Sequence, residues 1–543
     1  MGKSSFKDYV LLFLKIGLYI MLFLLFLLMA HSDSWQHRAV TWLKDPWHVA
    51  LVLIIIFGIL LRIKYYNVNT GVWWDEGEYL AKAKNWAFGT VMPNNYWTAR
   101  PVTLTLLWAL LLKLGGSVTL IRFLTELLPS VGTLVMMYLL GKEMYNKKVG
   151  VIATAMISVF WLHVFFTARL LMDLPGLFFS LVTIYCFWKG FVKHQGAKYI
   201  YLTIIFFLLT ALTKYNDGVI ILPFLLILLI KDRLSFLKNK VLWIATGLCL
   251  TLIFVPYLLF NYLSFGDALP ALTTYILNAK TSAIQQFEAP AYYVFGYFQQ
   301  FLLDFWFWFF IASLLLLWRL LFSLDLLVKR KNLDSLNDLF CVFLIAFPMI
   351  FFVFVYKFAV HQYLFLMTPA LFLLMARGTV EIDHFLSKYH KYLGIAAIVL
   401  ILVIGGYAQL KHGVGLIENK KDTYKELRDA GLWIKKHTGP AEPVMLTSNQ
   451  MEFGVFAERR IVSEGDNLSH FEEHLTDERP QYLVLSLMSD NPNYPWLLPL
   501  LNDHQDRFMP VQAWFADAQR KQPRVVIFKV VAFEDKNAPS ITL

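Results

Sequence analysis

Apolar runs long enough to cross a lipid bilayer recur along the chain, and this pattern restricts its fold more than any other feature. A membrane-spanning helix needs about 20 mostly apolar residues. Only 16% of the residues are charged, whereas soluble globular proteins average about 25%. The sequence therefore predicts a polytopic α-helical membrane protein of about 11–12 transmembrane helices. The expected spans are 9–30, 47–64, 119–141, 149–167, 174–192, 199–213, 217–231, 241–262, 300–321, 339–357, 361–377 and 392–409.

The composition changes after Leu410, because no later apolar run is long enough to span. We expect an extra membrane segment and linker at 1–46, a transmembrane domain at 47–409 and a soluble domain at 410–543. In the soluble domain, a helical pattern at 424–436 and short apolar stretches predict an α/β fold. The expected strands are 443–446, 460–462, 482–485 and 525–528.

The first segment, 9–30, lacks an obvious small-residue cleavage site, so we interpret it as an uncleaved anchor. If it spans, Lys3 and Lys7 lie outside, against the charge rule that orients helices. The three cysteines all lie in apolar spans, so no disulfide framework or zinc site is encoded. The net charge of +11 comes from loops between spans and reflects topology, not binding of nucleic acid.

Short loops rich in Lys and Arg alternate strictly with loops that are poor in them. Because cytoplasmic loops are the rich ones, the poor loops, the long loop 65–118 and the soluble domain lie outside the cytoplasm, at the cell membrane. Isolated polar residues from separate loops then meet at this face, which predicts one site. They are Asp75, Arg100, Asp173, Lys214 and His361.

Two segments of the external loops have their own pattern. The run 102–114 is too short to cross a bilayer core of about 30 Å, so we expect a helix in the interface or packed against the bundle. The polar loop 263–299 suits a mobile cover or an acceptor-binding loop.

An acidic cluster lies between aromatic residues in the first external loop, at 73–79. Asp75 can act there as a general base, or it can be a helix N-cap or a solvated loop acid. At most one of Glu76 and Glu78 is expected to join it, since adjacent residues on a helix do not share a face.

Other charges allow two interpretations each. Asp173 suits a helix N-cap as well as a catalytic role, and Arg169 could pair with it or bind phosphate. Arg100 and Lys214 suit membrane anchors or a clamp for a lipid-linked phosphate. Arg122 lies inside a span, where a charge marks function by default.

Metal binding and the role of His361 remain open in the same way. Asp75, Glu76 and Asp173 offer oxygen ligands to a divalent cation, although no spacing requires one. No other cofactor is indicated. A lone histidine such as His361 is more often a structural residue than a ligand or base.

Taken in order, these elements resemble the membrane-bound glycosyltransferases of the GT-C class, specifically the protein O-mannosyltransferase and aminoarabinose transferase superfamily. The resemblance covers most of residues 50–530. Its elements are Trp74-Asp75-Glu76 with Tyr79, Arg100-Pro101, Arg122, Arg169 with Asp173 and Pro175, Leu212-Thr213-Lys214, and Tyr363-Leu364 with Pro369.

The resemblance implies transfer of a sugar from a polyprenyl-phosphate donor to an acceptor outside the cytoplasm, with membrane lipids as further partners. Asp75 would be the general base and Glu76 its support, while Arg100 and Lys214 would hold the phosphate. The other substrate-binding candidates are Tyr79, Arg122, Arg169, Asp173, His361 and Tyr363.

Three departures and two competing functions remain. Arg100 stands where relatives have lysine before one or two prolines, His361-Gln362 stands where they often have arginine, and segment 9–30 is not part of the common core. A transporter or lipid flippase would bind substrate at the bilayer midplane, and a scaffold would leave these charges scattered. Convergence of the charges around one outer cavity would favour the transferase.

Overall fold

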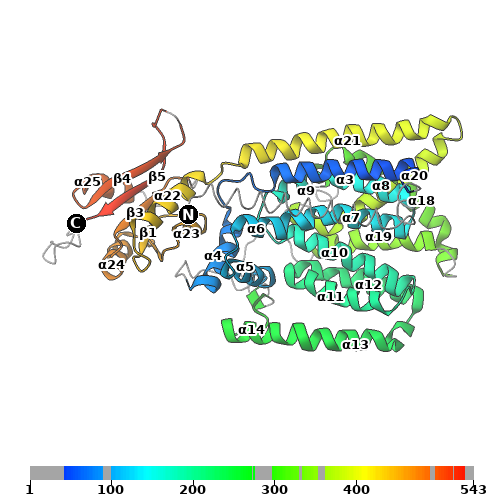
Figure 1. The fold of residues 1–543 in the computed structure, drawn as a ribbon, viewed down its shortest axis with the longest axis horizontal. Coiled ribbons are helices and arrows are strands. Elements are labelled where there is room, and N and C mark those ends of the chain that lie inside the picture. Colours follow the sequence, from blue (N-terminus) through cyan, green and yellow to red (C-terminus); the bar gives the residue numbers. More distant parts are fainter. Residues whose placement is uncertain are drawn as a thin grey trace, which may run out of the picture.

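The computed structural model describes residues 42–89, 100–271, 273–274, 296, 298–328, 333–352, 361–488, 496–517 and 519–531. A bundle of long helices and a smaller C-terminal domain lie end to end along the longest axis (Figure 1). The expected span 9–30 lies outside the described residues, as does most of the loop 263–299.

The bundle confirms a polytopic membrane fold. Among the described residues, seven helices are long and apolar enough to cross a membrane, or eight if one bent pair counts as a span. The other expected spans fall on described helices, except that 353–357 of the span 339–357 lie outside the described residues, and some of these helices are short or broken. The elements are α3 (Pro46–Tyr65), α6 (Val118–Arg122), η1 (Phe123–Leu127), α7 (Leu128–Met144), α8 (Lys147–Val159), α9 (Trp161–Thr167), α10 (Asp173–Phe187), η2 (Trp188–Val192), α11 (Ala197–Thr213), η3 (Tyr215–Ile220), α12 (Ile221–Asp232), η4 (Ser235–Lys238), α13 (Lys240–Cys249), η5 (Leu250–Phe254), α14 (Val255–Phe265), α17 (Phe298–Leu302), α18 (Phe305–Val328), α19 (Leu333–Ile350), η8 (His361–Met367), α20 (Thr368–Leu386) and α21 (Lys391–Lys420).

Burial separates the central helices from the peripheral ones. The span formed by η8 and α20 is 89% buried, whereas only 17% of α3 and 11% of the α13–α14 span are buried. Exposed leucines and aromatic residues on these outer helices, such as Leu252 and Leu263, suit contact with lipid. Figure 1 shows α13 and α14 along one margin of the bundle.

Helices α8 and α9 form the bent pair, with a bend of 57°. A break inside a membrane frees backbone groups that lipid cannot satisfy. Arg62 of α3 donates to the carbonyl oxygens of Ser158 at 3.1 Å and Ile157 at 3.4 Å. Gln409 of α21 accepts a hydrogen bond from the Trp161 backbone at 3.0 Å. Residues of α3 and α21 therefore supply partners for the backbone groups at the break. After it, α9 leads to the turn 168–172 at the end of the bundle nearest the C-terminal domain.

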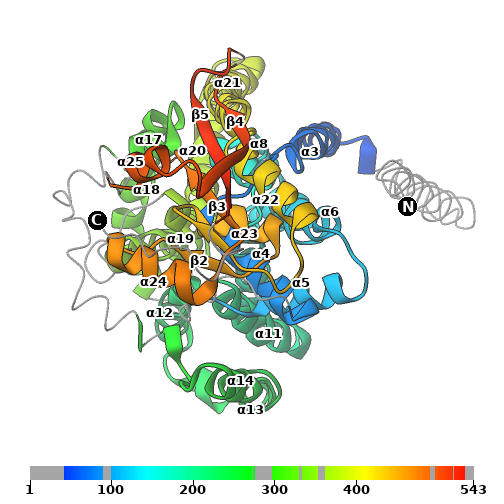
Figure 2. The ribbon, with the colours of Figure 1, turned by 90° about the vertical axis from the view of Figure 1, so that its left-hand side faces the viewer.

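The C-terminal domain is the expected α/β unit. Its helices are α22 (Lys425–His437), α23 (Gln450–Ala457), α24 (Leu468–Glu478) and α25 (Leu497–Asp503), and its strands are β1 (Val444–Leu446), β2 (Ile461–Ser463), β3 (Tyr482–Ser486), β4 (Phe508–Phe515) and β5 (Pro523–Val530). The sheet has the order β2-β1-β3-β5-β4. Strands β2, β1 and β3 are parallel, and β5 and β4 are antiparallel additions. Figure 2 views the molecule from this end.

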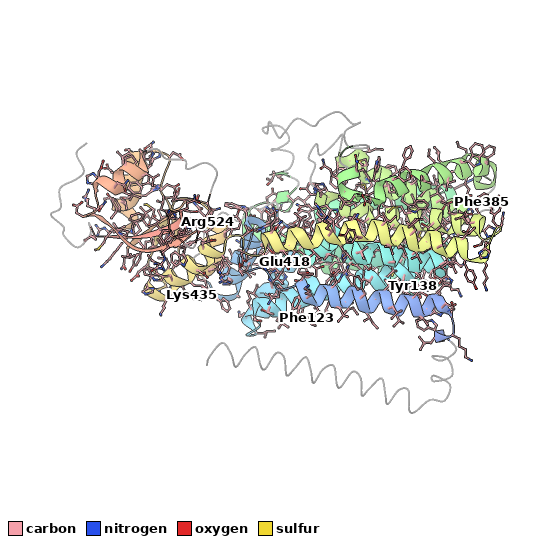
Figure 3. All side chains as sticks on the ribbon, turned by 90° about the horizontal axis from the view of Figure 1, so that it is seen from above. Phe123, Tyr138, Phe385, Glu418, Lys435 and Arg524 are labelled. Atoms are coloured by element: carbon pink, nitrogen blue, oxygen red, sulfur yellow. The ribbon has the colours of Figure 1, made fainter. Side chains whose placement is uncertain are left out.

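Helices cover both faces of this sheet. Alternate residues of β1 contribute to two apolar clusters, one with α22 and α23 and the other with α24 and α25. Strand β4 was not among the expected strands, because its sequence, FMPVQAWF, contains Pro510 and gives no clear alternation. In Figure 3, Lys435 and Arg524 mark this domain, and Phe385 marks the opposite end of the bundle.

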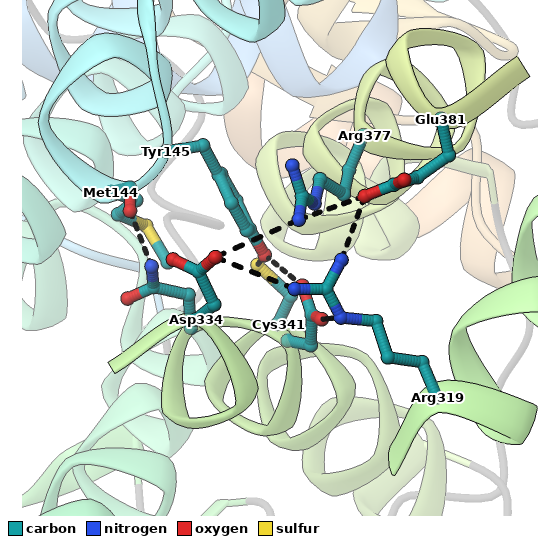
Figure 4. Close-up of polar contacts among 9 residues, drawn as sticks. Met144, Tyr145, Arg319, Asp334, Cys341, Arg377 and Glu381 are labelled. Atoms are coloured by element: carbon teal, nitrogen blue, oxygen red, sulfur yellow. Dashed lines mark hydrogen bonds and ion pairs between the residues drawn. The ribbon is translucent and has the colours of Figure 1, made fainter. Parts of the chain in front are cut away.

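The opposite end of the bundle is joined by an ion-pair network (Figure 4). Arg319 of α18 contacts Glu381 of α20 at 2.7 Å and Asp334 of α19 at 3.4 Å. Arg377 of α20 contacts Glu381 at 2.9 Å. These contacts hold three helices together far from the C-terminal domain.

Candidate functional site

A cavity of about 60 Å³ lies between the bundle and two short helices, α4 (Trp74–Phe88) and α5 (Thr103–Lys113). The helix α5 is the short one expected at 102–114, and it packs against α4 and the bundle. Residues from four separate parts of the chain line the cavity. They are Asp75, Tyr79, Arg100, Pro101, Leu171, Met172, Asp173, Lys214, Tyr215, Asn216, Gln362 and Tyr363.

The start of α4 sets the position of Asp75. Glu76, the third residue of the helix, accepts the backbone N–H of the N-cap residue Trp73 at 2.8 Å, which is the carboxylate half of a capping box. Because Trp73 is the N-cap, Asp75 lies in the first turn and is not the cap. Asp75 and Tyr79 are four residues apart, so both face the cavity. Burial raises the pKa of the Tyr79 phenol.

Arg100 holds two acids of α4 at once. Its Nη2 contacts Asp75, and its Nε donates to Glu78 at 3.1 Å. Its guanidinium also lies 5.5 Å from the centre of the Tyr79 ring. Burial acts to lower the pKa of Arg100, but Tyr79, Asp75 and Glu78 outweigh burial and raise it above its ordinary value. Arg100 is therefore a permanent cation at the wall of the cavity.

A second ion pair faces the first across the cavity. Lys214 follows α11 and donates to Asp173 at 2.7 Å and to the backbone carbonyl of Gln362 at 3.0 Å. Its Nζ lies 5.3 Å from the centre of the Tyr363 ring. Asp173 is the first residue of α10, whose N-cap is Met172, so the N-cap interpretation of Asp173 was wrong.

Glu76 lies outside the cavity and is fully buried. Its second oxygen accepts the backbone N–H of Leu170 at 2.5 Å. Arg122 and Arg169 approach the same carboxylate at 3.7 and 3.6 Å. Arg122 also donates to the carbonyl of Ala168 at 2.9 Å. Glu76 thus ties the start of α4 to the turn 168–172, which precedes Asp173.

Arg169 belongs to this buried cluster and not to the cavity wall. Its guanidinium lies 3.5 Å from the centre of the Trp73 ring. Burial lowers its pKa to about 10, so it remains charged at neutral pH. The suggested pairing of Arg169 with Asp173 was wrong, because Lys214 takes that place.

The structure does not bring His361 to the cavity lining. His361 begins η8, the short helix that also holds Tyr363, and its ring packs against Trp161 at 5.6 Å between centroids. Of the predicted site residues, six line the cavity: Asp75, Tyr79, Arg100, Asp173, Lys214 and Tyr363. Glu76, Arg122 and Arg169 form the cluster behind them.

Sequence reasoning did not select Glu78 as the anchor of Arg100. The signal was available, because Glu78 lies three residues after Asp75 and such residues share a helical face. The Gln362 carbonyl and Asn216 carried no comparable signal, since their place depends on how the helices pack.

The carboxylates that could bind a divalent cation already have basic partners. Asp75 pairs with Arg100, Asp173 pairs with Lys214, and Glu76 is buried behind them. Among the described residues, no group of three or more histidines, cysteines or acids gathers in metal-binding geometry. A dication bound by Asp75 or Asp173 would have to displace an arginine or a lysine from that acid.

Comparisons with known proteins concern the class of protein and its fold. Residues 99–260 match the family model of dolichyl-phosphate-mannose-protein mannosyltransferase. No curated protein matches the chain significantly in sequence.

Two solved structures share the fold over most of the chain. ArnT from Cupriavidus metallidurans, bound to undecaprenyl phosphate, has a TM-score of 0.62 and 10% identity, over 89% of this chain and 98% of that one. The archaeal oligosaccharyltransferase AglB from Archaeoglobus fulgidus, in complex with an inhibitory peptide and a dolichol-phosphate, has a TM-score of 0.58 and 13% identity, over 92% of this chain and 76% of that one. The family match over residues 99–260 indicates a glycosyltransferase, and the chain as a whole shares the fold of ArnT and AglB.

Proposed function

We propose that the protein transfers a sugar from a polyprenyl-phosphate donor to an acceptor hydroxyl on the extracytoplasmic side of the cell membrane, with Asp75 as general base. The observation that carries this proposal is the cavity lined by one partly exposed acid, Asp75, and two partly buried cations, Arg100 and Lys214. ArnT binds undecaprenyl phosphate and AglB binds a dolichol-phosphate, and the two cations suit the phosphate of such a lipid.

The chemistry follows from these charges. The acceptor oxygen attacks the anomeric carbon of the donor while Asp75 removes the hydroxyl proton. The bond between this carbon and the phosphate oxygen breaks, and its electron pair stays on the phosphate. Arg100 and Lys214 stabilise the charge that develops there. The products are a glycoside and the free polyprenyl phosphate.

The ion pair between Arg100 and Asp75 must open before this reaction. A water needs about 10–15 Å³ of such space, so a cavity of about 60 Å³ holds only a few waters and no sugar phosphate. Arg100 has a second anchor, because its Nε donates to the buried Glu78. The donor phosphate can therefore take the Nη edge of Arg100 and release Asp75 for the acceptor, while Glu78 keeps the guanidinium in place.

The proposed orientation rests on the charge pattern of the loops. The cavity lies beside α4, at the end of the bundle that carries the C-terminal domain, and the Lys/Arg-rich loop after α20 lies at the other end, which Phe385 marks in Figure 3. Since cytoplasmic loops carry the excess of basic residues, the cavity and the C-terminal domain face outside the cytoplasm. The gathering of charges at one end also favours a transferase over a transporter, which binds at the midplane.

Transfer of labelled sugar from polyprenyl-phosphate donors by the purified protein in detergent tests this proposal. Asp75→Asn should lower turnover by about 10²–10⁴-fold, the usual contribution of a positioned general base, and should leave binding of the donor intact. Equal turnover of the variant and the wild type would rule out Asp75 as the base.

A further inference from the structure

Two opposite faces of the helix α4 contact different parts of the molecule. Asp75 and Tyr79 face the cavity. Gly77 and Lys84 are seven residues apart, so they share a face, and the helical period places that face opposite Asp75. The C-terminal domain covers this second face, because its helix α23 packs directly against α4.

The contact at Gly77 is closer than any side chain would allow. A Cβ atom at Gly77 would lie 2.8 Å from the backbone oxygen of Met451 and 2.9 Å from its carbonyl carbon, both in α23. Backbone atoms cannot move aside as a flexible side chain can. The glycine therefore sets how near the helix that carries Asp75 lies to the C-terminal domain.

At the other end of the same face, Lys84 binds the C-terminal domain. Its Nζ donates to the carbonyl of Val455 at 2.8 Å and to the Glu458 carboxylate at 2.7 Å. Val455 and Glu458 lie at the C-terminal end of α23, where carbonyl groups lack partners within the helix and a cation is favourable. Glu458 also contacts Lys435 of α22 at 2.6 Å, so the pair is anchored within the domain.

The segment just before α4 is bound to the same domain. The Thr70 backbone N–H donates to the Lys421 carbonyl at 2.8 Å, and Arg428 of α22 donates to the Thr70 carbonyl at 3.1 Å. A Cβ at Gly71 would lie 2.5 Å from the Thr423 carbonyl oxygen. Both the approach to α4 and its outer face are thus held by residues after Lys420.

We propose that the C-terminal domain is a positioning part of the active site, in which the Gly77–Met451 contact and the Lys84–Glu458 pair hold Asp75 at its place over the cavity. This inference rests on the proposed function of Asp75. It assigns the domain a role in turnover itself, through positioning residues that touch neither donor nor acceptor.

Gly77→Ala tests the close contact. The added methyl group must push α4 away from Met451, so turnover per folded enzyme should fall by about tenfold to a hundredfold, the cost of a misplacement near 1 Å. Binding of polyprenyl phosphate should not change. The control is Gly247→Ala in α13, because a Cβ there meets no atom within 4 Å.

Lys84→Glu tests the ion pair. It should lower turnover and raise amide hydrogen exchange in residues 74–88, and adding Glu458→Lys should restore part of both. Lys435→Met is the matched control, because it removes the other partner of Glu458 without touching α4.

Hydrogen exchange makes the test independent of the reaction. Unchanged exchange and turnover in Gly77→Ala and Lys84→Glu would overturn the positioning role, even with an active wild type. If the two variants raise hydrogen exchange in α4 but the wild type transfers no sugar, the result supports the domain contact and contradicts the proposed function. A fall in the amount of folded protein with normal turnover of the rest would show a merely structural contact and also overturn the proposal.

Discussion

Two neighbouring carboxylates in α4 have different surroundings and therefore different roles. The Asp75 side chain is 36% exposed and faces the cavity, whereas the Glu76 side chain is fully buried and bound by two backbone N–H groups and two arginines. The sequence predicted that these adjacent acids do not share a helical face, but it did not show that Glu76 points into a buried cluster with Arg122 and Arg169.

Glu76→Gln should separate these roles. Removing one partner of a buried ion pair costs on the order of 3 kcal/mol, so the midpoint of thermal unfolding should fall together with turnover. Asp75→Asn should leave that midpoint near the wild-type value, because a partly exposed ion pair contributes at most about 1 kcal/mol. Differential scanning fluorimetry in detergent measures both, and an unchanged midpoint for Glu76→Gln would contradict its positioning role.

Glu452 of α23 makes stability depend on pH. Burial raises its pKa, and the nearby charge of Asp75 adds to this shift. Its Oε2 has no hydrogen-bond partner among the described residues. Below the ordinary glutamate pKa of about 4.3, the folded and unfolded chains are both protonated. Above it, the unfolded chain ionises first, so the free energy of unfolding falls until the pH passes the folded-state pKa.

Glu452→Gln cannot ionise, so it should escape this loss. The variant should unfold at a higher temperature than the wild type at pH 8, and the difference should shrink towards pH 4. Glu473→Gln, an exposed acid in the same domain, should keep the wild-type pH dependence. A Glu452→Gln curve parallel to the wild-type curve would contradict the raised pKa.

At the scale of elements, Arg62 stabilises the break between α8 and α9. Arg62→Met should leave the carbonyls of Ile157 and Ser158 without their donor, at about 1–3 kcal/mol for each buried group. The unfolding midpoint should fall, and turnover should fall with it because the turn 168–172 follows α9. Lys64→Met, two residues later on an exposed face of α3, should change neither. A normal midpoint for Arg62→Met would show that water or another group satisfies the break.

Most elements could be predicted because their signals are local. Apolar length predicted the membrane helices, and short apolar stretches predicted β1, β2, β3 and β5. The bend at α9 and the strand β4 could not be predicted in the same way. The bend depends on Arg62 and Gln409 from distant helices, and β4 pairs with β5 through its backbone while half of its side chains stay exposed.

At the scale of the whole molecule, the charge pattern predicted which residues would meet, but not how they pair. The cavity contains residues from the first external loop, α10, the end of α11 and η8, as the loop charges indicated. The partners inside it depend on a few ångströms of helix packing. Thus Lys214 and not Arg169 contacts Asp173, and His361 packs against Trp161.

Topology is the last property that follows from this charge pattern. The three native cysteines are all buried, so an introduced exposed cysteine should dominate labelling by thiol reagents. Lys436→Cys, exposed on α22, should react with a membrane-impermeant maleimide added to intact cells. Lys388→Cys, exposed in the turn after α20, should react only after the cells are permeabilised. The reverse result would place the cavity and the C-terminal domain in the cytoplasm, where the excess of Lys and Arg at the opposite end would violate the rule that orients membrane helices.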